Sequence, residues 1–458
     1  MRNESSIPIE SVSSLKEFEA NEYVVKCVAI AMVVIAVFVQ GIGKKRCVAM
    51  LPTTGIFVLF GFVVGVLVQS TNHTNTFHRL FLFDSSLFFS VLLPPILFHT
   101  GVQTNLDKFE GHLTTVGVLV LFGTLVSWIL TATMIYQLSP FFGAFELTYL
   151  ECLLFSSVVA STDPVSVVPL LSATNVPHSL YAMVVGESAL NDGVSLVLYR
   201  VVSSWIERDL DLQSNLMLSA ILDFGVSFGT SFLIGISFGL LCVLLSAVIE
   251  RTNSSNTSEI VAIQSGLLCL VPYLCYTVCE ASRTSGIVGI LFCGGVVSKY
   301  ALWELDGVTR TSFEHMTHTI SHLAETAVFL IFGLALSYTR RIEFKAMSFA
   351  ILSLLCVLLA RGVHVVLTCV VVNLFRAPPD RYGGKVVFFT WLSGLRGTIS
   401  FALICTVHHT ITNDQVVRVM HVGVLVVTLV TMIVGGGLLP LAMKWFPFKP
   451  GDGLPHSI

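Results

Sequence analysis

Two carboxylates, Glu187 and Asp192, lie in the middle of an otherwise apolar segment over 179–203. If the segment crosses a bilayer, each charge costs roughly 2.5–3.5 kcal/mol on insertion scales, so a chain rarely keeps one without a use. The two residues are separated by about 500° of helical rotation, so they project in different directions and can have different partners. A third acid, Asp163, lies in the preceding apolar segment. Acids in two neighbouring spans indicate a path for a cation or a proton.

Four charged residues of both signs lie at mid-span positions: Glu187, Glu325, Arg361 and Arg396. Buried charges are tolerated when they are paired, so structural ion pairs are the expected state of these four. Asp163 and Asp192 then remain as the candidates to hold transported ions. Asn191 offers a neutral oxygen beside Asp192 rather than a second charge.

The composition is that of a membrane protein with many spans. Hydrophobic residues make up 54% of the 458, charged residues make up 12%, and the mean hydropathy is +0.84. The net charge of −3 does not indicate a class of partner, and no basic run in the sequence suggests nucleic acid. The cysteines show no metal-binding spacing, so we expect neither a resident metal nor a cofactor.

The apolar segments predict an all-α membrane protein, because a helix of about 20 apolar residues crosses the hydrocarbon core. About thirteen candidate spans follow in the order 23–40, 47–68, 80–98, 113–137, 147–170, 179–203, 217–248, 259–278, 285–299, 317–337, 346–375, 385–407 and 416–442. We therefore expect a polar tail over 1–22, one transmembrane domain over 23–442 and a short tail over 443–458. The distribution of Lys and Arg between the loops predicts that this last tail is cytosolic.

The fifth span cannot be a plain helix. Pro164 lacks an amide donor and pushes Asp163 out of the helical region, while Asp followed by Pro is also a common helix start. We predict a helix that stops near Ser161 and restarts at Pro164, leaving free backbone groups at mid-membrane. The alternative is a simple proline kink capped by Asp163.

The twelfth span carries a comparable interruption over 391–400, with two glycines, three hydroxyl side chains and Arg396. If spans 1–6 and 8–13 are two inverted six-helix repeats, spans 5 and 12 occupy matching positions in them. Paired interrupted helices of this kind indicate the midplane site of a transporter. The alternative is that Gly394 and Gly397 only allow close helix packing.

Six motifs in this order resemble the eukaryotic sodium/proton exchangers of the monovalent cation/proton antiporter superfamily. They are 88–98 (FFSVLLPPILF), 161–165 (STDPV), 186–192 (GESALND), 324–326 (AET), 360–361 (AR) and 394–397 (GLRG). The stretch over 285–300 most resembles the organellar branch, which favours a Golgi, endosomal or vacuolar-type membrane over the plasma membrane.

The resemblance implies that Asp192 carries the cation and the proton in turn, and that Asn191 is the partner typical of electroneutral members. It makes Thr162, Asp163 and Ser188 neighbours of the ion. It further implies a pair between Glu187 and Arg361, a structural role for Arg396, a homodimer and an elevator-like motion. Glu325 belongs to a matching motif and is expected to be a supporting charge.

Two features depart from the family pattern. His99 follows the Pro-Pro-Ile-Leu-Phe motif where many relatives carry an acid or an amide, so the role of this position is open. The sequence ends at Ile458, so we expect no long cytosolic regulatory tail.

The sequence therefore predicts electroneutral exchange of Na⁺ or K⁺ for H⁺ by competition at Asp192. A carboxyl group removed from water holds its proton more tightly, and carboxylate, amide and hydroxyl oxygens suit an alkali cation. The main alternative is a passive cation channel without proton coupling. An intramembrane enzyme is disfavoured because the chain has neither a Gly-x-Ser-x-Gly nor a His-Glu-x-x-His motif.

Overall fold

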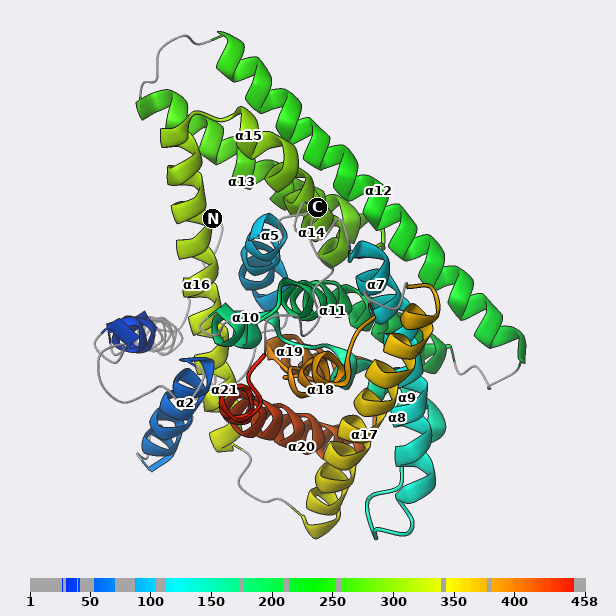
Figure 1. The fold of residues 1–458 in the computed structure, drawn as a ribbon. Helices are drawn as coiled ribbons and strands as arrows, with labels where there is room; N and C mark the ends of the chain where they lie inside the picture. The colour runs from blue at the N-terminus through cyan, green and yellow to red at the C-terminus, as the bar shows by residue number, and fades with distance from the viewer. Residues whose placement is uncertain are drawn as a thin grey trace, which may run out of the picture. The chain divides into compact units, whose positions relative to one another are not determined.

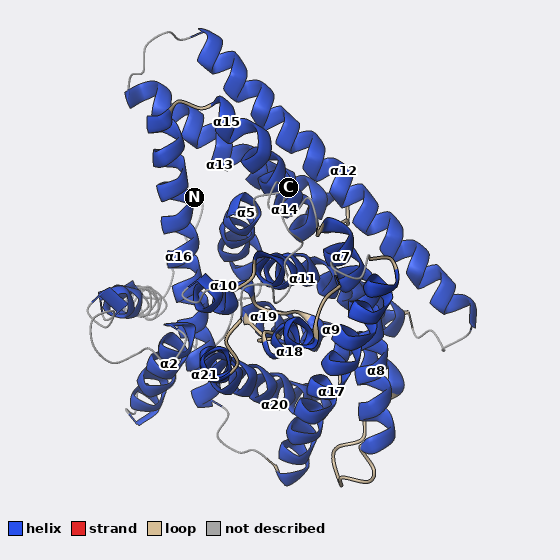
Figure 2. Ribbon diagram, in the orientation of Figure 1, coloured by secondary structure: helices blue, strands red, loops and turns tan. Residues whose placement is uncertain are grey.

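The computed structural model describes residues 53–70, 87–103, 112–172, 176–208, 214–252, 258–338, 343–376 and 381–448, with a helical piece over 30–38 and three residues near it. Across these residues the regular structure is helical and contains no strand (Figure 2). The predicted tail over 1–22 lies outside the described residues, as do 449–458 and part of the first predicted span.

Each predicted span from 47 onward overlaps one or more helices (Figure 1). In chain order these are α2 (Thr53–Ser70), α5 (Leu93–Gln103), α7 (Leu113–Val118), α8 (Thr124–Leu138), α9 (Tyr149–Ala160), α10 (Pro164–Ser172), α11 (His178–Glu207), α12 (Ser214–Thr252), α13 (Ser258–Ala281), α14 (Gly286–Val296), α15 (Leu302–Glu304), α16 (Gly307–Tyr338), α17 (Phe344–Leu374), α18 (Gly384–Leu392), α19 (Thr398–Thr406), α20 (Asp414–Val430) and α21 (Gly436–Trp445).

Single π-helical turns occur within several of these spans. They are η1 (Phe88–Leu92) before α5, η2 (Leu119–Gly123) between α7 and α8, η3 (Val297–Ala301) after α14, and η6 (Thr431–Gly435) between α20 and α21. A 3₁₀ turn, η5 (Val407–His409), follows α19. Such π turns often lie near functional positions, and η1 and η2 directly precede Leu93 and Thr124 of the site described below.

The helices confirm an all-helical, multi-pass membrane protein. Seven continuous helical stretches in the described part of the chain are long and apolar enough to cross a membrane, and four shorter helices are also apolar. Two of these shorter helices, α9 and the stretch Thr398–His409, are halves of the interrupted spans 5 and 12. The count of thirteen spans and the two inverted repeats stay predictions.

The chain divides into two compact units. The described parts of the smaller unit include α2 and the last part of α16, from Thr326 onward. There the two backbones approach closely, since a Cβ at Gly61 or at Gly333 would collide with main-chain atoms of the other helix. The larger unit holds the remaining helices from α5 to α21 and contains every residue of the candidate site.

A buried apolar cluster in the larger unit packs around the two interrupted spans. It joins α10, α11, α17, α18 and α21 through residues that include Val167, Met183, Val365, Phe389 and Leu439. Because these side chains are almost fully buried, the cluster holds the ends of the broken helices in place. The long helix α12 is far more exposed, as expected for a helix that faces lipid.

Candidate functional site

The fifth span is broken at the position that the sequence predicts. A capping box formed by Thr148 and Glu151 starts α9, and the helix ends at Ala160. The next three residues are non-helical, and α10 starts at Pro164. Because Pro164 cannot donate an amide hydrogen bond and forces its predecessor out of the helical region, the break follows from local chemistry.

The twelfth span is broken as well, and the two breaks touch. Helix α18 ends at Leu392 and α19 starts at Thr398, with a non-helical stretch between them. The amide of Asp163 donates to the carbonyl oxygen of Leu395 over 2.8 Å. The two interrupted helices therefore meet through their main chains at the point where both lack helical hydrogen bonds.

The guanidinium of Arg396, from the second break, binds the end of α9 in the first. Its Nη1 donates to the carbonyl oxygens of Ala160 and Ser161, the latter at 3.0 Å. The side-chain amide of Asn191, from α11, also donates to the Ala160 carbonyl, at 2.8 Å. These donors satisfy carbonyls that the helix end leaves without partners, and they place a positive charge at its negative pole.

Arg361, from α17, likewise donates hydrogen bonds to carbonyls at the end of α18. Its Nη2 and Nε donate to the carbonyls of Thr390 and Trp391 at 3.0 and 3.3 Å. The same guanidinium binds both carboxylate oxygens of Glu187 at 2.7 and 3.1 Å. Both side chains are buried, with 3% and 0% exposed, so the pair has the bidentate geometry that a desolvated ion pair needs.

Asp192 has no arginine in direct contact among the described residues, and Asp163 lies in the first break and lines the same pocket. One oxygen of Asp192 accepts from the hydroxyl of Ser161 at 2.5 Å. The carboxylate of Asp163 accepts from the side-chain hydroxyl of Ser166, three residues later. Behind them, the hydroxyl of Thr162 donates to Ser188 at 3.3 Å.

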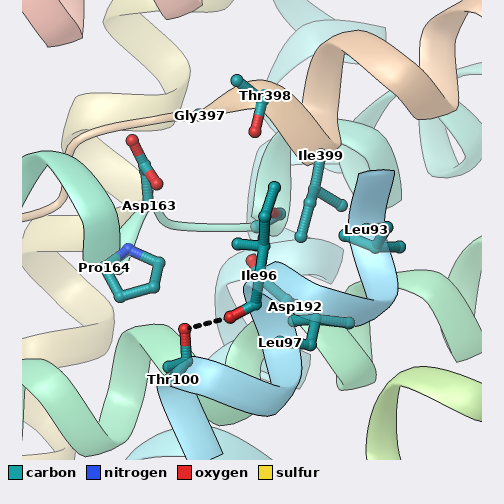
Figure 3. Close-up of a pocket in the computed structure, with 11 residues that line it drawn as sticks. Leu93, Ile96, Leu97, Thr100, Asp163, Pro164, Asp192, Gly397, Thr398 and Ile399 are labelled. Carbon is teal, nitrogen blue, oxygen red and sulfur yellow. Dashed lines mark hydrogen bonds between the residues drawn. The ribbon is translucent and has the colours of Figure 1, made fainter. Parts of the chain in front are cut away.

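Both acids open onto one pocket within the larger unit (Figure 3). Its lining residues come from α5, the two breaks, α11 and the start of α19: Leu93, Ile96, Leu97, Thr100, Ser161, Asp163, Pro164, Asp192, Gly397, Thr398 and Ile399. The volume open to the centre of a water molecule is about 20 Å³, which is room for one water or one small cation. A small, mostly apolar pocket with two carboxylates suits a small positively charged ion.

Comparison with known proteins identifies the family. The family profile described as "Sodium/hydrogen exchanger, transmembrane" matches residues 16–445. The chain belongs to the sodium/hydrogen exchanger family. Members of this family are secondary transporters, not enzymes.

Named relatives agree with this assignment. Sodium/hydrogen exchanger 5 of Arabidopsis thaliana is 28% identical over 407 residues, which cover 89% of this chain and 77% of the relative. Sodium/hydrogen exchanger 8 of Homo sapiens is 26% identical over 85% of this chain and 66% of the relative. This chain spans only 60% of the Gallus gallus exchanger 8, which is also 26% identical over 77% of this chain.

The fold is shared with a solved antiporter. The structure of the sodium proton antiporter MjNhaP1 from Methanocaldococcus jannaschii at pH 8 superposes with a TM-score of 0.69. The match covers 93% of this chain and 98% of that protein at 18% identity. At this identity the likeness shows the fold alone.

The exchanger's predicted site residues fall into two groups. Asp163 and Asp192 line the pocket, whereas the predicted ion neighbours Thr162, Ser188 and Asn191 hydrogen-bond to one another and to the α9 end beside it. Asn191 also accepts from the hydroxyl of Thr124 in α8 at 2.9 Å, a contact that sequence reasoning missed because that threonine carries no local signal.

Two expectations about charge pairing are wrong. Glu325 and Arg396 were expected to be paired with buried charges, yet Glu325 accepts from the hydroxyl of Ser321 at 2.8 Å on its own helix, α16. Arg396 donates hydrogen bonds to main-chain carbonyls instead, because the carbonyls at the end of a broken helix lack helical partners. Neither residue forms an ion pair with a described side chain.

His99 lies on α5, next to the pocket residue Thr100. Its ring centroid is 5.4 Å from that of His318 in α16, in an edge-on arrangement. Among the described residues, no group of three or more His, Cys, Asp or Glu side chains is placed to hold a metal ion.

Proposed function

We propose that this chain exchanges Na⁺ or K⁺ for H⁺ across its membrane, with cation and proton competing for the carboxylate of Asp192. The observation that carries the proposal is the setting of this group. Asp192 is 2% exposed, opens onto the pocket at the crossing of two broken helices, and has no ion-pair partner among the described residues. A carboxylate in that setting needs a cation or a proton to neutralise it.

Charge counting at the crossing supports an electroneutral cycle. Three carboxylates (Asp163, Glu187 and Asp192) and two guanidiniums (Arg361 and Arg396) leave one net negative charge when all are ionised. One monovalent cation or one proton cancels that charge. The crossing would then be neutral both with a cation bound and with a proton bound. Only the neutral crossing would switch its opening from one side of the membrane to the other.

The finer features follow the family resemblance. We place Thr162, Ser188 and Asn191 as supports of the ion site, and Glu187 with Arg361 as its structural pair. We also propose about thirteen spans in two inverted repeats, a homodimer with an elevator-like motion, a cytosolic C-terminal side and an organellar membrane. The relatives named sodium/hydrogen exchanger 5 and 8 support the general class of this assignment.

The test is cation-driven proton movement in liposomes that contain the purified protein and an internal pH dye. After acid loading, addition of external Na⁺ or K⁺ should raise the internal pH, and protein-free liposomes should not respond. Comparing Na⁺, K⁺ and Li⁺ gives the preference. A passive channel would instead carry a cation current while leaving the internal pH unchanged once the membrane potential is clamped at zero, and that result would contradict exchange.

A further inference from the structure

Three hydroxyl side chains line the pocket, and two of them are already engaged. The hydroxyl of Thr100 donates to the carbonyl of Ile96 on its own helix at 2.9 Å. The hydroxyl of Ser161 donates to Asp192. The third, Thr398, has no hydrogen-bond partner among the described residues. It is the one hydroxyl of the described lining with both donor and acceptor capacity unused.

Thr398 is the first residue of α19, directly after the second break. Figure 3 shows its oxygen directed away from the helix and into the pocket, on the side where Asp163 lies. The preceding residue, Gly397, makes this approach possible, because a Cβ there would collide with the side chain of Asp163. The break thus brings the free hydroxyl and the carboxylate of Asp163 to the same small space.

Thr398 is half-buried at the pocket, so its hydroxyl oxygen is available to a bound species there. Hydroxyl oxygens are hard neutral ligands, the type that alkali cations accept together with carboxylates. We propose that the Thr398 hydroxyl is a direct ligand of the transported cation and helps to set the preference among Na⁺, K⁺ and Li⁺. The proposal rests on the proposed exchange function and goes beyond it, because it assigns cation selectivity to a residue of the second break.

The experiment compares Thr398→Val, which keeps the shape and removes the hydroxyl, with Thr398→Ser, which keeps the hydroxyl. In proteoliposomes, Thr398→Val should raise the KM for Na⁺ about five- to tenfold, leave kcat within about twofold, and change the ratio of KM values for Na⁺ and K⁺. Thr398→Ser should restore the wild-type KM. Thr230→Val is the matched control, because the Thr230 hydroxyl of α12 bonds only to carbonyls of its own helix.

A binding measurement separates this proposal from the exchange function. Na⁺ should raise the thermal unfolding temperature of the purified protein in detergent, and Thr398→Val should need several times more Na⁺ for half of that shift. If the wild type binds Na⁺ but moves no protons, exchange fails while the ligand assignment is still tested. An unchanged KM and an unchanged Na⁺ midpoint in Thr398→Val would overturn the proposal. Equal losses in the Val and Ser variants would also overturn it. If Thr398→Val does not fold, Thr398→Ala takes its place.

Discussion

The guanidinium of Arg361 in α17 holds both carboxylate oxygens of Glu187 in α11 and, with the same group, binds two carbonyls at the end of α18. One buried side chain thus connects three helices. A Cβ at Gly394 would collide with this guanidinium, so the glycine of the second break makes room for it. The pair therefore holds the helices of the crossing in place and is not itself part of the ion pathway.

Breaking this pair should be costly. Removing one partner of a buried ion pair leaves an uncompensated charge and typically costs about 3–5 kcal/mol. We expect Glu187→Ala and Arg361→Ala each to lower the unfolding temperature sharply, and the double variant to lose less than the sum of the two. Arg310→Ala is the control, because its pair with Glu314 is nearly half exposed and worth about 0.3–0.5 kcal/mol. Additive losses would mean that the two side chains do not interact in the folded protein.

Gly397→Ala should impair transport more than it impairs folding. The backbone at Gly397 is extended, with φ −129° and ψ −163°, so alanine can adopt it. The added Cβ would, however, fall on Asp163 and displace it from the pocket. Exchange rates in liposomes should drop at least tenfold while the detergent-purified protein stays monodisperse. Gly225→Ala in α12, where a Cβ meets no atom within 4 Å, should exchange at the wild-type rate. Normal transport by the Gly397 variant would argue against a role for Asp163.

Exchange should not respond to membrane voltage. One excess negative charge at the crossing implies one cation for one proton, so no net charge moves in a cycle. In an electrogenic exchanger, the free energy of one transport cycle would change by about 2.3 kcal/mol per net charge moved for each 100 mV. The measurement clamps the liposome potential with valinomycin and uses Na⁺ as the driving cation. The Na⁺/H⁺ equilibrium point should stay constant over the imposed range. A systematic shift would show that Asp163 or Glu187 titrates together with Asp192.

Local chemistry made part of this site predictable. The sequence Asp163-Pro164 within an apolar segment predicts a broken helix, and the structure has the break between Ala160 and Pro164. The cost of an isolated buried charge predicted that Glu187 and Arg361 need partners, and the family resemblance paired them with each other. The hydrogen-bond partners of Arg396 and the direction of the Thr398 hydroxyl toward the pocket could not be predicted in the same way. Both depend on how two breaks more than 200 residues apart in sequence cross, and no pattern within either break encodes that crossing.

The central claim is that Asp192 is the group for which cation and proton compete. Asp192→Asn keeps the size of the side chain and removes its ability to ionise, so it tests this claim most directly. Asp223→Asn is the matched control, since Asp223 is an exposed acid of α12. Both variants are reconstituted in liposomes after their folding has been verified in detergent. We predict that Na⁺-driven proton flux disappears in Asp192→Asn and persists at the wild-type rate in Asp223→Asn. Appreciable Na⁺-driven proton flux in folded Asp192→Asn would contradict the account and place the carrier at another residue.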